Sequence, residues 1–288
     1  MISVSDLAFT YPGANSATLN HLSFEIASGE VYGLLGPSGA GKSTTQKILM
    51  GLLSGFSGSA RLFGEDVSSL GRAIYERIGV SFELPTLYLR LTARENLKLF
   101  AALYDRPTRT PEEVLTMVDL QDAADQRVET FSKGMKMRLN LCRALLHDPE
   151  LLFLDEPTTG QDPARARITR ELILRLKSEG KTIFLTTHNM TEADEVCDRV
   201  GFLSGGNIPV SGTPADLKRE FGRRYLAVDA RDGDKIKRHE FSMQGLGTNR
   251  QFMDLLEADR IASMHTLEAS LDDVFIKATG GAIGEAAQ

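Results

Sequence analysis

The chain begins with segments in which apolar and polar residues alternate, as expected for strands that are buried on one face. Residues 2–9 (ISVSDLAF) alternate in this way, and residues 22–36 (LSFEIASGEVYGLLG) start similarly before they become mostly apolar. Turn-forming residues at 28–30 separate the two halves of the second segment. We therefore expect strands on both sides of this turn, and residues 31–35 should form a buried strand.

Two later segments are short, unbroken and apolar. They are residues 151–154 (LLFL) and 182–187 (TIFLTT), and helical patterns border both of them. Runs of this kind are typical of parallel strands that are covered on both faces. Together with strands expected at 60–67 and near 201–203, and a helix at 44–53, they predict a parallel α/β core.

Helical periodicity replaces the strand patterns between residues 84 and 150. Thr92 and Glu95 have the spacing of a capping box, in which each side chain bonds the backbone N–H of the other residue. One apolar helix face should follow, formed by Leu97, Phe100, Leu103 and Tyr104. We interpret residues 84–150 as a helical region inserted into the core.

The character of the chain changes near residues 204–214, where Gly and Pro become frequent. We therefore expect a core domain of residues 1–215 and a small α+β accessory domain of residues 216–288. The features expected in the second domain are a weak strand at YLAVDA, a hairpin turn at Asp232-Gly233, a helix that begins near Asn249, a helix capped by Ser270 with Asp273, and a frayed tail at 280–288.

Composition and charge narrow the possible functions. Of the 288 residues, 42% are hydrophobic and 25% are charged, which is ordinary for a globular protein with a sizeable core. The net charge of −6 gives no sign of a protein that binds nucleic acid or anionic membranes. Cys142 and Cys197 lack disulfide-framework or zinc-site spacing, which suits a reducing cytosol. We see no leader segment and no apolar run of the ~18–20 residues that a membrane span needs, so another chain would have to cross a membrane.

A phosphate-binding loop follows the buried strand at 31–35. The sequence GPSGAGKST fits the pattern G-x-x-x-x-G-K-[ST], in which backbone N–H groups and the start of a helix surround phosphate oxygens. Lys42 would reach the β- and γ-phosphates, and the Ser43 hydroxyl would ligate Mg²⁺. The alternative is a plain turn with an exposed lysine. The nucleotide-binding residues expected here are Gly36, Pro37, Ser38, Gly39, Ala40, Gly41, Lys42, Ser43 and Thr44.

Two adjacent carboxylates end the buried strand at 151–154. Asp155 would hold Mg²⁺, and Glu156 would orient and polarise an attacking water as general base. Both should lie at the carboxyl edge of the sheet, where open α/β sheets bind ligands. The alternative is that they are two acidic residues at the start of a surface turn.

A second candidate for anion binding lies in FSKGMKMRLNLCRALLHDPE, residues 131–150. Ser132 has the character of a helix cap, and Gly134 allows a backbone to approach closely. Serine, glycine and a helix N-terminus can together bind an anion. Taken alone, the segment is an amphipathic core helix.

These motifs in this order resemble the ATP-binding subunits of ABC transporters over residues 2–215. The resemblance implies a P-loop NTPase core of ABC type with an antiparallel β subdomain, a helical subdomain and a C-terminal α+β extension. It identifies the Walker A loop at 36–44, the Walker B acids Asp155 and Glu156, a signature segment at 131–135 and a D-loop at 159–162. It also makes His188 a switch histidine that contacts the γ-phosphate, although a histidine after a strand can simply cap a helix. Tyr11 matches the aromatic residue that stacks on adenine, or it is a core residue at a strand end.

The resemblance also implies partners. A second copy of the chain would supply Ser132, Gly134 and Asp162 to close over ATP and Mg²⁺, so the active unit would be a head-to-tail homodimer. The pair would bind an integral membrane permease through residues 83–90 and would lie peripherally on the cytoplasmic face of the inner or plasma membrane. No nucleic acid is expected as a partner.

The chain departs from the usual family pattern in three places. The signature is FSKGM where LSGGQ is common, which resembles one exporter branch. Glu83 stands where a Mg²⁺-linked glutamine is usual, and we expect it to be a metal-linked coupling residue that also faces the permease. The alternatives are an alignment shifted by one place or a residue that only faces solvent. Gln161 replaces a common leucine without an evident consequence.

The C-terminal extension, which ends near SLDDVFIKATG, resembles that of bacterial drug, antibiotic and polysaccharide exporters. Within that branch, IGVSFELPTLYLRLTARENL is similar to fluoroquinolone-type export ATPases. The expected function is therefore ATP hydrolysis that powers a separate permease, with export of drugs or other small molecules. One alternative is a soluble ATPase of the same fold that acts on nucleic acid or ribosomes, and another is an ATP-binding regulator that does not hydrolyse.

Overall fold

The computed structural model describes residues 1–221, 225–232, 235–267 and 269–280. The chain divides into two compact units, Met1–Thr213 and a second one that begins at Pro214. The predicted turn residue Gly233 and most of the predicted frayed tail, residues 281–288, lie outside the described residues. We describe each unit by itself.

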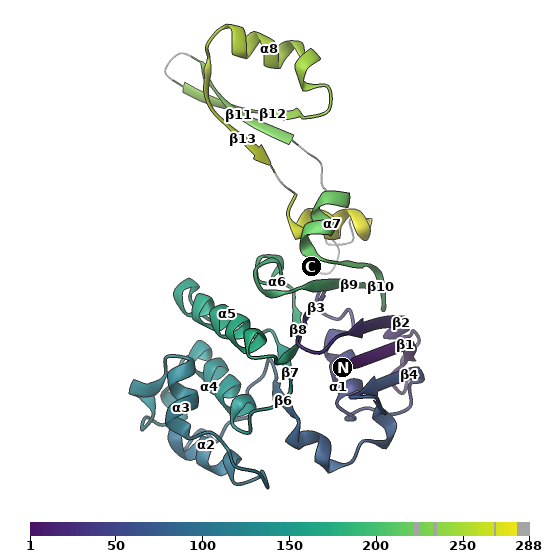
Figure 1. Ribbon diagram of the computed structural model, residues 1–288, viewed down its shortest axis with the longest axis vertical. Helices are drawn as coiled ribbons and strands as arrows, with labels where there is room; N and C mark the ends of the chain where they lie inside the picture. Colours follow the sequence, from purple (N-terminus) through teal and green to yellow (C-terminus); the bar gives the residue numbers. More distant parts are fainter. Residues whose placement is uncertain (222–224, 233–234, 268, 281–288) are drawn as a thin grey trace. The chain divides into compact units, whose positions relative to one another are not determined.

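A mainly parallel sheet forms the centre of the first unit, with the strand order β10-β9-β3-β8-β7-β6 (Figure 1). Every residue of β3, β7 and β8 is buried, which confirms the prediction of parallel strands covered on both faces. Only β10 is antiparallel to its neighbour. The strands are β3 (Val31–Leu35), β6 (Ile78–Ser81), β7 (Leu151–Asp155), β8 (Thr182–Thr187), β9 (Arg199–Ser204) and β10 (Asn207–Gly212).

An antiparallel sheet with the order β2-β1-β4-β5 packs against the central one. Its strands are β1 (Ile2–Phe9), β2 (Leu19–Ile26), β4 (Ser57–Leu62) and β5 (Glu65–Asp66). The rings of Phe24 and Tyr32 stack between the sheets at 5.4 Å, which joins both sheets in one core. The single strand predicted at 60–67 is wrong, because Phe63 and Gly64 take positive φ values of 55° and 87° and turn the chain back on itself.

Helices surround the central sheet, and Figure 1 shows α2, α3 and α4 grouped on the side away from β1, β2 and β4. The helices are α1 (Lys42–Leu49), α2 (Ala93–Ala101), α3 (Pro111–Met117), α4 (Lys133–Leu145), α5 (Pro163–Ser178) and α6 (Met190–Val196), with 3₁₀ turns at Val67–Ser69, Arg72–Glu76, Gln121–Ala123 and Val128–Thr130.

The helix ends follow the capping chemistry of the sequence. The capping box of Thr92 and Glu95 is present and starts α2. The apolar face predicted to run from Leu97 to Tyr104 is wrong beyond the helix end: α2 stops at Ala101, and Leu103 is 71% exposed. The helix predicted at 44–53 begins earlier, at Lys42, and ends at Leu49, because Gly51 has a φ of 71°.

The second unit contains a sheet with the order β12-β11-β13. Its pairing of Asp232 with Lys235 confirms the predicted hairpin, and Asn249 and Ser270 cap helices as predicted. A helix that starts at Pro214 and the strand β13 were not predicted. The elements are α7 (Pro214–Phe221), β11 (Tyr225–Asp232), β12 (Lys235–Ser242), a 3₁₀ turn (Leu246–Thr248), α8 (Arg250–Glu257), β13 (Ile261–Leu267) and α9 (Leu271–Ala278).

Candidate nucleotide-binding site

The loop between β3 and α1 needs glycine for two reasons. Gly41, at the N-terminus of α1, has a φ of 112°, a conformation that side chains rarely adopt. A Cβ at Gly41 would also lie 2.7 Å from Leu19, and one at Gly36 would lie 2.4 Å from the carbonyl oxygen of Leu203. The loop is therefore packed tightly against β2 and β9, so the start of α1 is held in place.

Lys42 is held by the loop that carries it. Its Nζ donates to the carbonyl oxygens of Gly36 at 2.6 Å and Pro37 at 3.1 Å, and the residue is only 8% exposed. Burial lowers the pKa of Lys42, and the nearby carboxylates of Glu156, Asp155 and Glu83 oppose this shift. The site thus holds a partly desolvated cation beside three acids.

Asp155, the last residue of β7, points toward the phosphate loop. Its Oδ2 accepts a hydrogen bond from the Ser43 hydroxyl at 3.3 Å, and its Oδ1 accepts one from Thr186 at 2.5 Å. Gln46 in turn donates to the Thr186 hydroxyl at 3.1 Å. The network fixes the carboxylate from both neighbouring elements, α1 and β8.

Glu156 turns away from Asp155 because the chain leaves the strand at this residue. Its φ of 49° is unusual for a residue with a side chain, and strain of this kind clusters at functional sites. Its Oε1 accepts the backbone N–H of His188 at 3.0 Å and lies 2.7 Å from His188 Nδ1. The Glu156 side chain is 7% exposed, while that of His188 is 64% exposed. A buried acid is thus linked to an imidazole that reaches solvent.

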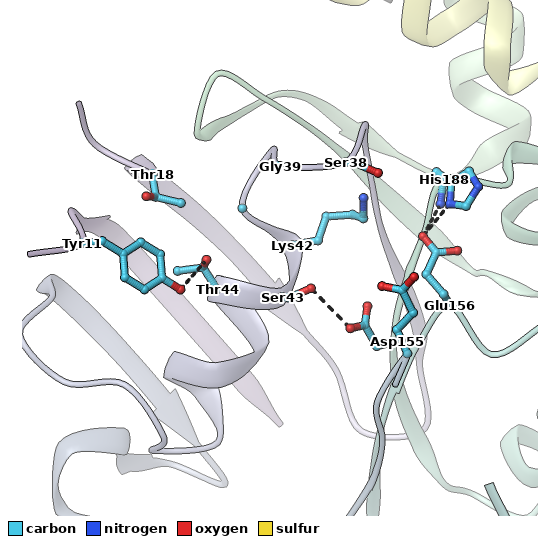
Figure 2. A pocket seen from close by; sticks show the side chains of 12 residues that line it. Tyr11, Thr18, Ser38, Gly39, Lys42, Ser43, Thr44, Asp155, Glu156 and His188 are labelled. Atoms are coloured by element: carbon cyan, nitrogen blue, oxygen red, sulfur yellow. Dashed lines mark hydrogen bonds and ion pairs between the residues drawn. The ribbon is translucent and has the colours of Figure 1, made fainter. Parts of the chain in front are cut away.

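These groups line one pocket of about 450 Å³. Figure 2 shows the pairs Ser43–Asp155 and Glu156–His188 on one side and Tyr11–Thr44 on the other. The Tyr11 hydroxyl lies 3.2 Å from Thr44 Oγ1, and its ring meets Phe9 edge-on while 37% of the residue stays exposed. The lining residues are Tyr11, Thr18, Ser38, Gly39, Gly41, Lys42, Ser43, Thr44, Glu83, Asp155, Glu156 and His188.

Six predicted site residues do not line this pocket in the described chain. Gly36, Pro37 and Ala40 belong to the phosphate loop itself, whereas Ser132, Gly134 and Asp162 lie elsewhere in the chain. Ser132 accepts a hydrogen bond from the Met135 N–H and caps α4, and Asp162 caps α5 by accepting two N–H groups at 3.1 Å. A Cβ at Gly134 would lie 2.8 Å from the carbonyl oxygen of Gly160. One chain therefore does not bring Ser132, Gly134 or Asp162 to its own phosphate loop.

The sequence analysis missed several residues that support the site. Thr18 lines the pocket, Thr186 and Gln46 hold Asp155, and Thr187 lies 3.2 Å from Glu156. A signal was available for two of them: Thr186 and Thr187 are polar residues at the carboxyl end of a strand that is otherwise apolar.

The chain matches a known family over segments that carry most of this pocket. The profile of the family described as "ABC transporter" matches residues 19–159. The fluoroquinolones export ATP-binding protein of Mycobacterium tuberculosis (strain H37Rv) is 48% identical over 281 residues, which cover 97% of this chain and 93% of the relative. This chain is an ABC transporter ATP-binding subunit.

Further comparisons agree with this family. The bacitracin transport ATP-binding protein BcrA of Bacillus licheniformis is 35% identical and covers 98% of both chains. Residues 227–268 match the family described as "Fluoroquinolone efflux ABC transporter C-terminal domain". The dimeric ATP-binding cassette MJ0796 with ADP and Pi has a TM-score of 0.68 at 25% identity, covering 74% of this chain and 98% of the cassette.

The predicted family, its exporter branch and its fold are therefore confirmed. As an ABC ATP-binding subunit, the chain powers a separate membrane permease, and the soluble ATPase acting on nucleic acid or ribosomes is not favoured. Among the described residues, no helix is long and apolar enough to cross a membrane.

Proposed function

We propose that the chain hydrolyses ATP with Mg²⁺ as a homodimer and so drives the export of a drug-like small molecule through its permease. The observation that carries the proposal is that two carboxylates, each with a different hydrogen-bond partner, lie beside one phosphate loop. Asp155 bonds Ser43 on the loop side, and Glu156 bonds His188 on the open side. Two acids with separate partners can take separate roles in one reaction.

The residues at the phosphate loop fit a Mg²⁺ ion. Ser43, Asp155 and Glu83 offer hydroxyl and carboxylate oxygens, the ligand type that Mg²⁺ prefers. In the described part of the chain, no cluster of three or more His, Cys, Asp and Glu side chains is arranged to hold a metal by itself. P-loop proteins use phosphate oxygens as further ligands. A bound Mg²⁺ would neutralise charge that develops on the phosphates.

The chain's own residues would do the rest of the chemistry. Tyr11, with its half-exposed ring, would stack on the adenine. Lys42 and the loop N–H groups would bind the phosphates. Glu156 would accept a proton from the attacking water, and His188 would contact the γ-phosphate and hold that water in line.

A second copy would complete the pocket. Ser132 and Gly134 lie at the N-terminus of α4, where backbone N–H groups attract an anion, and Asp162 lies at the start of α5. Since these residues do not line the pocket of their own chain, they are available to cover ATP bound by a partner. Closure of the pair would be the mechanical step that moves the permease.

The proposed cargo class follows from the relatives. One relative is named for the export of fluoroquinolones, another for the transport of bacitracin, and residues 227–268 match the fluoroquinolone efflux C-terminal domain. The test first purifies the chain and identifies the integral membrane protein that copurifies with it. The two proteins are then expressed together, and the accumulation of a fluoroquinolone is measured in those cells. Equal accumulation with and without the pair would reject the drug as cargo. Copurification of RNA or DNA in place of a membrane protein would reject the transport role.

The catalytic assignment has its own test. We expect Glu156→Gln to lower the rate of phosphate release about 100-fold or more, because a general base contributes at least that much. ATP binding should persist, since the amide keeps the shape of the side chain. The matched control is Glu171→Gln on α5, whose carboxylate is 59% exposed and pairs with Arg167. Ordinary turnover by Glu156→Gln would exclude Glu156 as the base.

A further inference from the structure

A buried hydroxyl lies directly behind Glu156. Thr187 Oγ1 is 3.2 Å from Glu156 Oε2 and 2.9 Å from Oε2 of Glu192, and it accepts the backbone N–H of Asn189 at 3.0 Å. Thr187 is fully buried, and Glu192, on α6, is 1% exposed. Two carboxyl groups therefore share one threonine hydroxyl away from water.

Thr187 has too few hydrogens to bond both glutamates. A threonine hydroxyl carries one hydrogen and can donate one hydrogen bond. If Glu156 and Glu192 were both ionised, one of the two short contacts would join two oxygens with no proton between them. Such a contact between a lone pair and a buried negative charge is costly. The arrangement is satisfied when one of the two glutamates carries a proton.

Both carboxylate oxygens of Glu156 have hydrogen-bond partners besides Thr187. Its Oε1 accepts the backbone N–H of His188, and His188 Nδ1 lies at 2.7 Å. The hydroxyl of Thr159 donates to its Oε2 at 3.4 Å. Hydrogen bonds to a carboxylate stabilise its charged form. Glu156 therefore has the partners that a negative charge needs.

Glu192 is more buried than Glu156, and one of its oxygens has no hydrogen bond within the described part of the chain. Its Oε1 is buried without a hydrogen bond of normal geometry among the described residues. Burial raises the pKa of Glu192, and the charge of Glu156 adds to the shift. The hydroxyls of Thr187 and Thr158 and the charge of Arg170 oppose it, and the buried thiol of Cys197 is the other titratable group that Glu192 influences. Burial and the neighbouring charge therefore favour Glu192 as the carrier of the shared proton.

We propose that Glu192 is a positioning residue that carries a proton and donates a hydrogen bond to Thr187, so that Thr187 donates its own to Glu156. This proposal rests on the proposed role of Glu156 as the base. The hydrogen bonds from Glu192 to Thr187 and from Thr187 to Glu156 hold Oε2 of Glu156 on its buried side. His188 holds Oε1 of Glu156 on the solvent side. Its consequence is a base with one orientation, which raises kcat without touching ATP.

The test compares two substitutions of Glu192 in the full chain. Glu192→Gln keeps a neutral N–H donor toward Thr187, and Glu192→Met keeps the approximate length but donates nothing. We expect Glu192→Gln to retain kcat within about threefold and Glu192→Met to lose about tenfold, with the KM for ATP nearly unchanged in both. The control is Glu195→Met, a substitution on the same helix as Glu192. It removes an exposed carboxylate that pairs with Arg170. Equal losses for Glu192→Gln and Glu192→Met would overturn the proposal.

A double substitution shows whether Glu192 acts through Thr187. Thr187→Val removes the hydroxyl and keeps the branched shape. In that background we expect Glu192→Met to add no further loss of kcat, because the connection to Glu156 is already broken. A full additional loss would mean that Glu192 acts by another route and would overturn the proposal.

The protonation state can be measured without turnover. We expect the infrared carbonyl band of a protonated carboxyl group in the ATP-free chain at neutral pH, and we expect Glu192→Gln to remove it. An unchanged spectrum would overturn the proposal even where kcat follows the expected order. If the unsubstituted chain fails to hydrolyse ATP, the proposed function fails, and the infrared band still decides whether Glu192 carries the proton.

Discussion

At the scale of the residue, one backbone angle separates two acids that are neighbours in the chain. Asp155 ends β7 and faces Ser43, whereas Glu156 has a φ of 49° and faces His188. Alternation along a strand predicts opposite directions for the two side chains. In the structure the two side chains are separated in another way, because the backbone leaves the strand at Glu156.

The carboxylate of Glu83 offers a residue-scale prediction about the metal. Glu83 is exposed and lines the pocket. Its charge opposes the lowering of the Lys42 pKa that burial causes. We expect Glu83→Gln to raise the Mg²⁺ concentration for half-maximal ATPase activity about fivefold, because one contact between exposed charges is worth about 1 kcal/mol. The measurement is a Mg²⁺ titration of turnover, with and without the permease. Unchanged Mg²⁺ dependence and unchanged stimulation by the permease would reject a role in metal binding or coupling.

Glu192 also makes the free energy of unfolding depend on pH. Because burial raises its pKa above the ordinary 4.5, the folded chain holds this proton more tightly than the unfolded chain does. The contribution to stability is therefore complete below pH 4.5 and is lost as the pH rises through the raised value. Glu192→Gln has no such proton, so its Tm relative to the unsubstituted chain should improve as the pH rises above 4.5. A Tm difference that stays constant with pH would contradict the shift.

At the scale of the element, caps decide where the functional helices begin. Gly41 starts α1 at the phosphate loop, Ser132 starts α4, and Asp162 starts α5. Ser132 and Asp162 accept hydrogen bonds from backbone N–H groups of their own helices, so both side chains have a structural use beside any use in ATP binding.

Two substitutions at Ser132 separate these uses. We expect Ser132→Ala to lower the free energy of unfolding by about 1 kcal/mol, because it removes the side-chain oxygen that accepts the Met135 N–H. Ser132→Asp keeps the cap and should keep the stability, but its negative charge should repel the phosphates of ATP bound by a partner. Denaturant unfolding measures the first effect and ATPase activity the second. Full activity of Ser132→Asp would show that Ser132 does not approach the nucleotide.

At the scale of the whole molecule, Ser132 and Gly134 do not line the pocket of their own chain, which is why we propose that two chains assemble. The similar cassette MJ0796, whose match covers 74% of this chain, is dimeric in a post-hydrolysis state with ADP and Pi bound. The resemblance predicts the same for this chain, and its described residues leave the relevant helix starts outside the pocket.

An assembly measurement tests this directly. We expect Glu156→Gln with saturating ATP and Mg²⁺ to form a dimer that light scattering detects, because slow hydrolysis traps the closed pair. Replacement of ATP by ADP is the control and should leave monomers. Adding Ser132→Asp to Glu156→Gln should also leave monomers. A strictly monomeric Glu156→Gln chain at saturating ATP, also in the presence of its permease, would contradict the proposed dimer.

Sequence alone determined the parts of this protein that depend on local patterns. Buried strands at 31–35, 151–154 and 182–187, the caps at Thr92, Asn249 and Ser270, and the phosphate loop follow from residues that are close in the chain. Hydrophobic runs, capping side chains and glycine turns act over a few residues, so their effects can be predicted from the order of residues.

Only the tertiary structure decided which distant residues hold the acids. Thr186 and Thr187 on β8 come 31 residues after the acids that they contact, and parallel pairing of β7 with β8 places them there. The end of α2 at Ala101 and the turn at Phe63 and Gly64 were likewise decided by how segments pack. Such contacts depend on sheet register and on burial, which no local pattern encodes. The burial of Glu192 beside Thr187 is of this kind, because it exists only once α6 packs against the sheet.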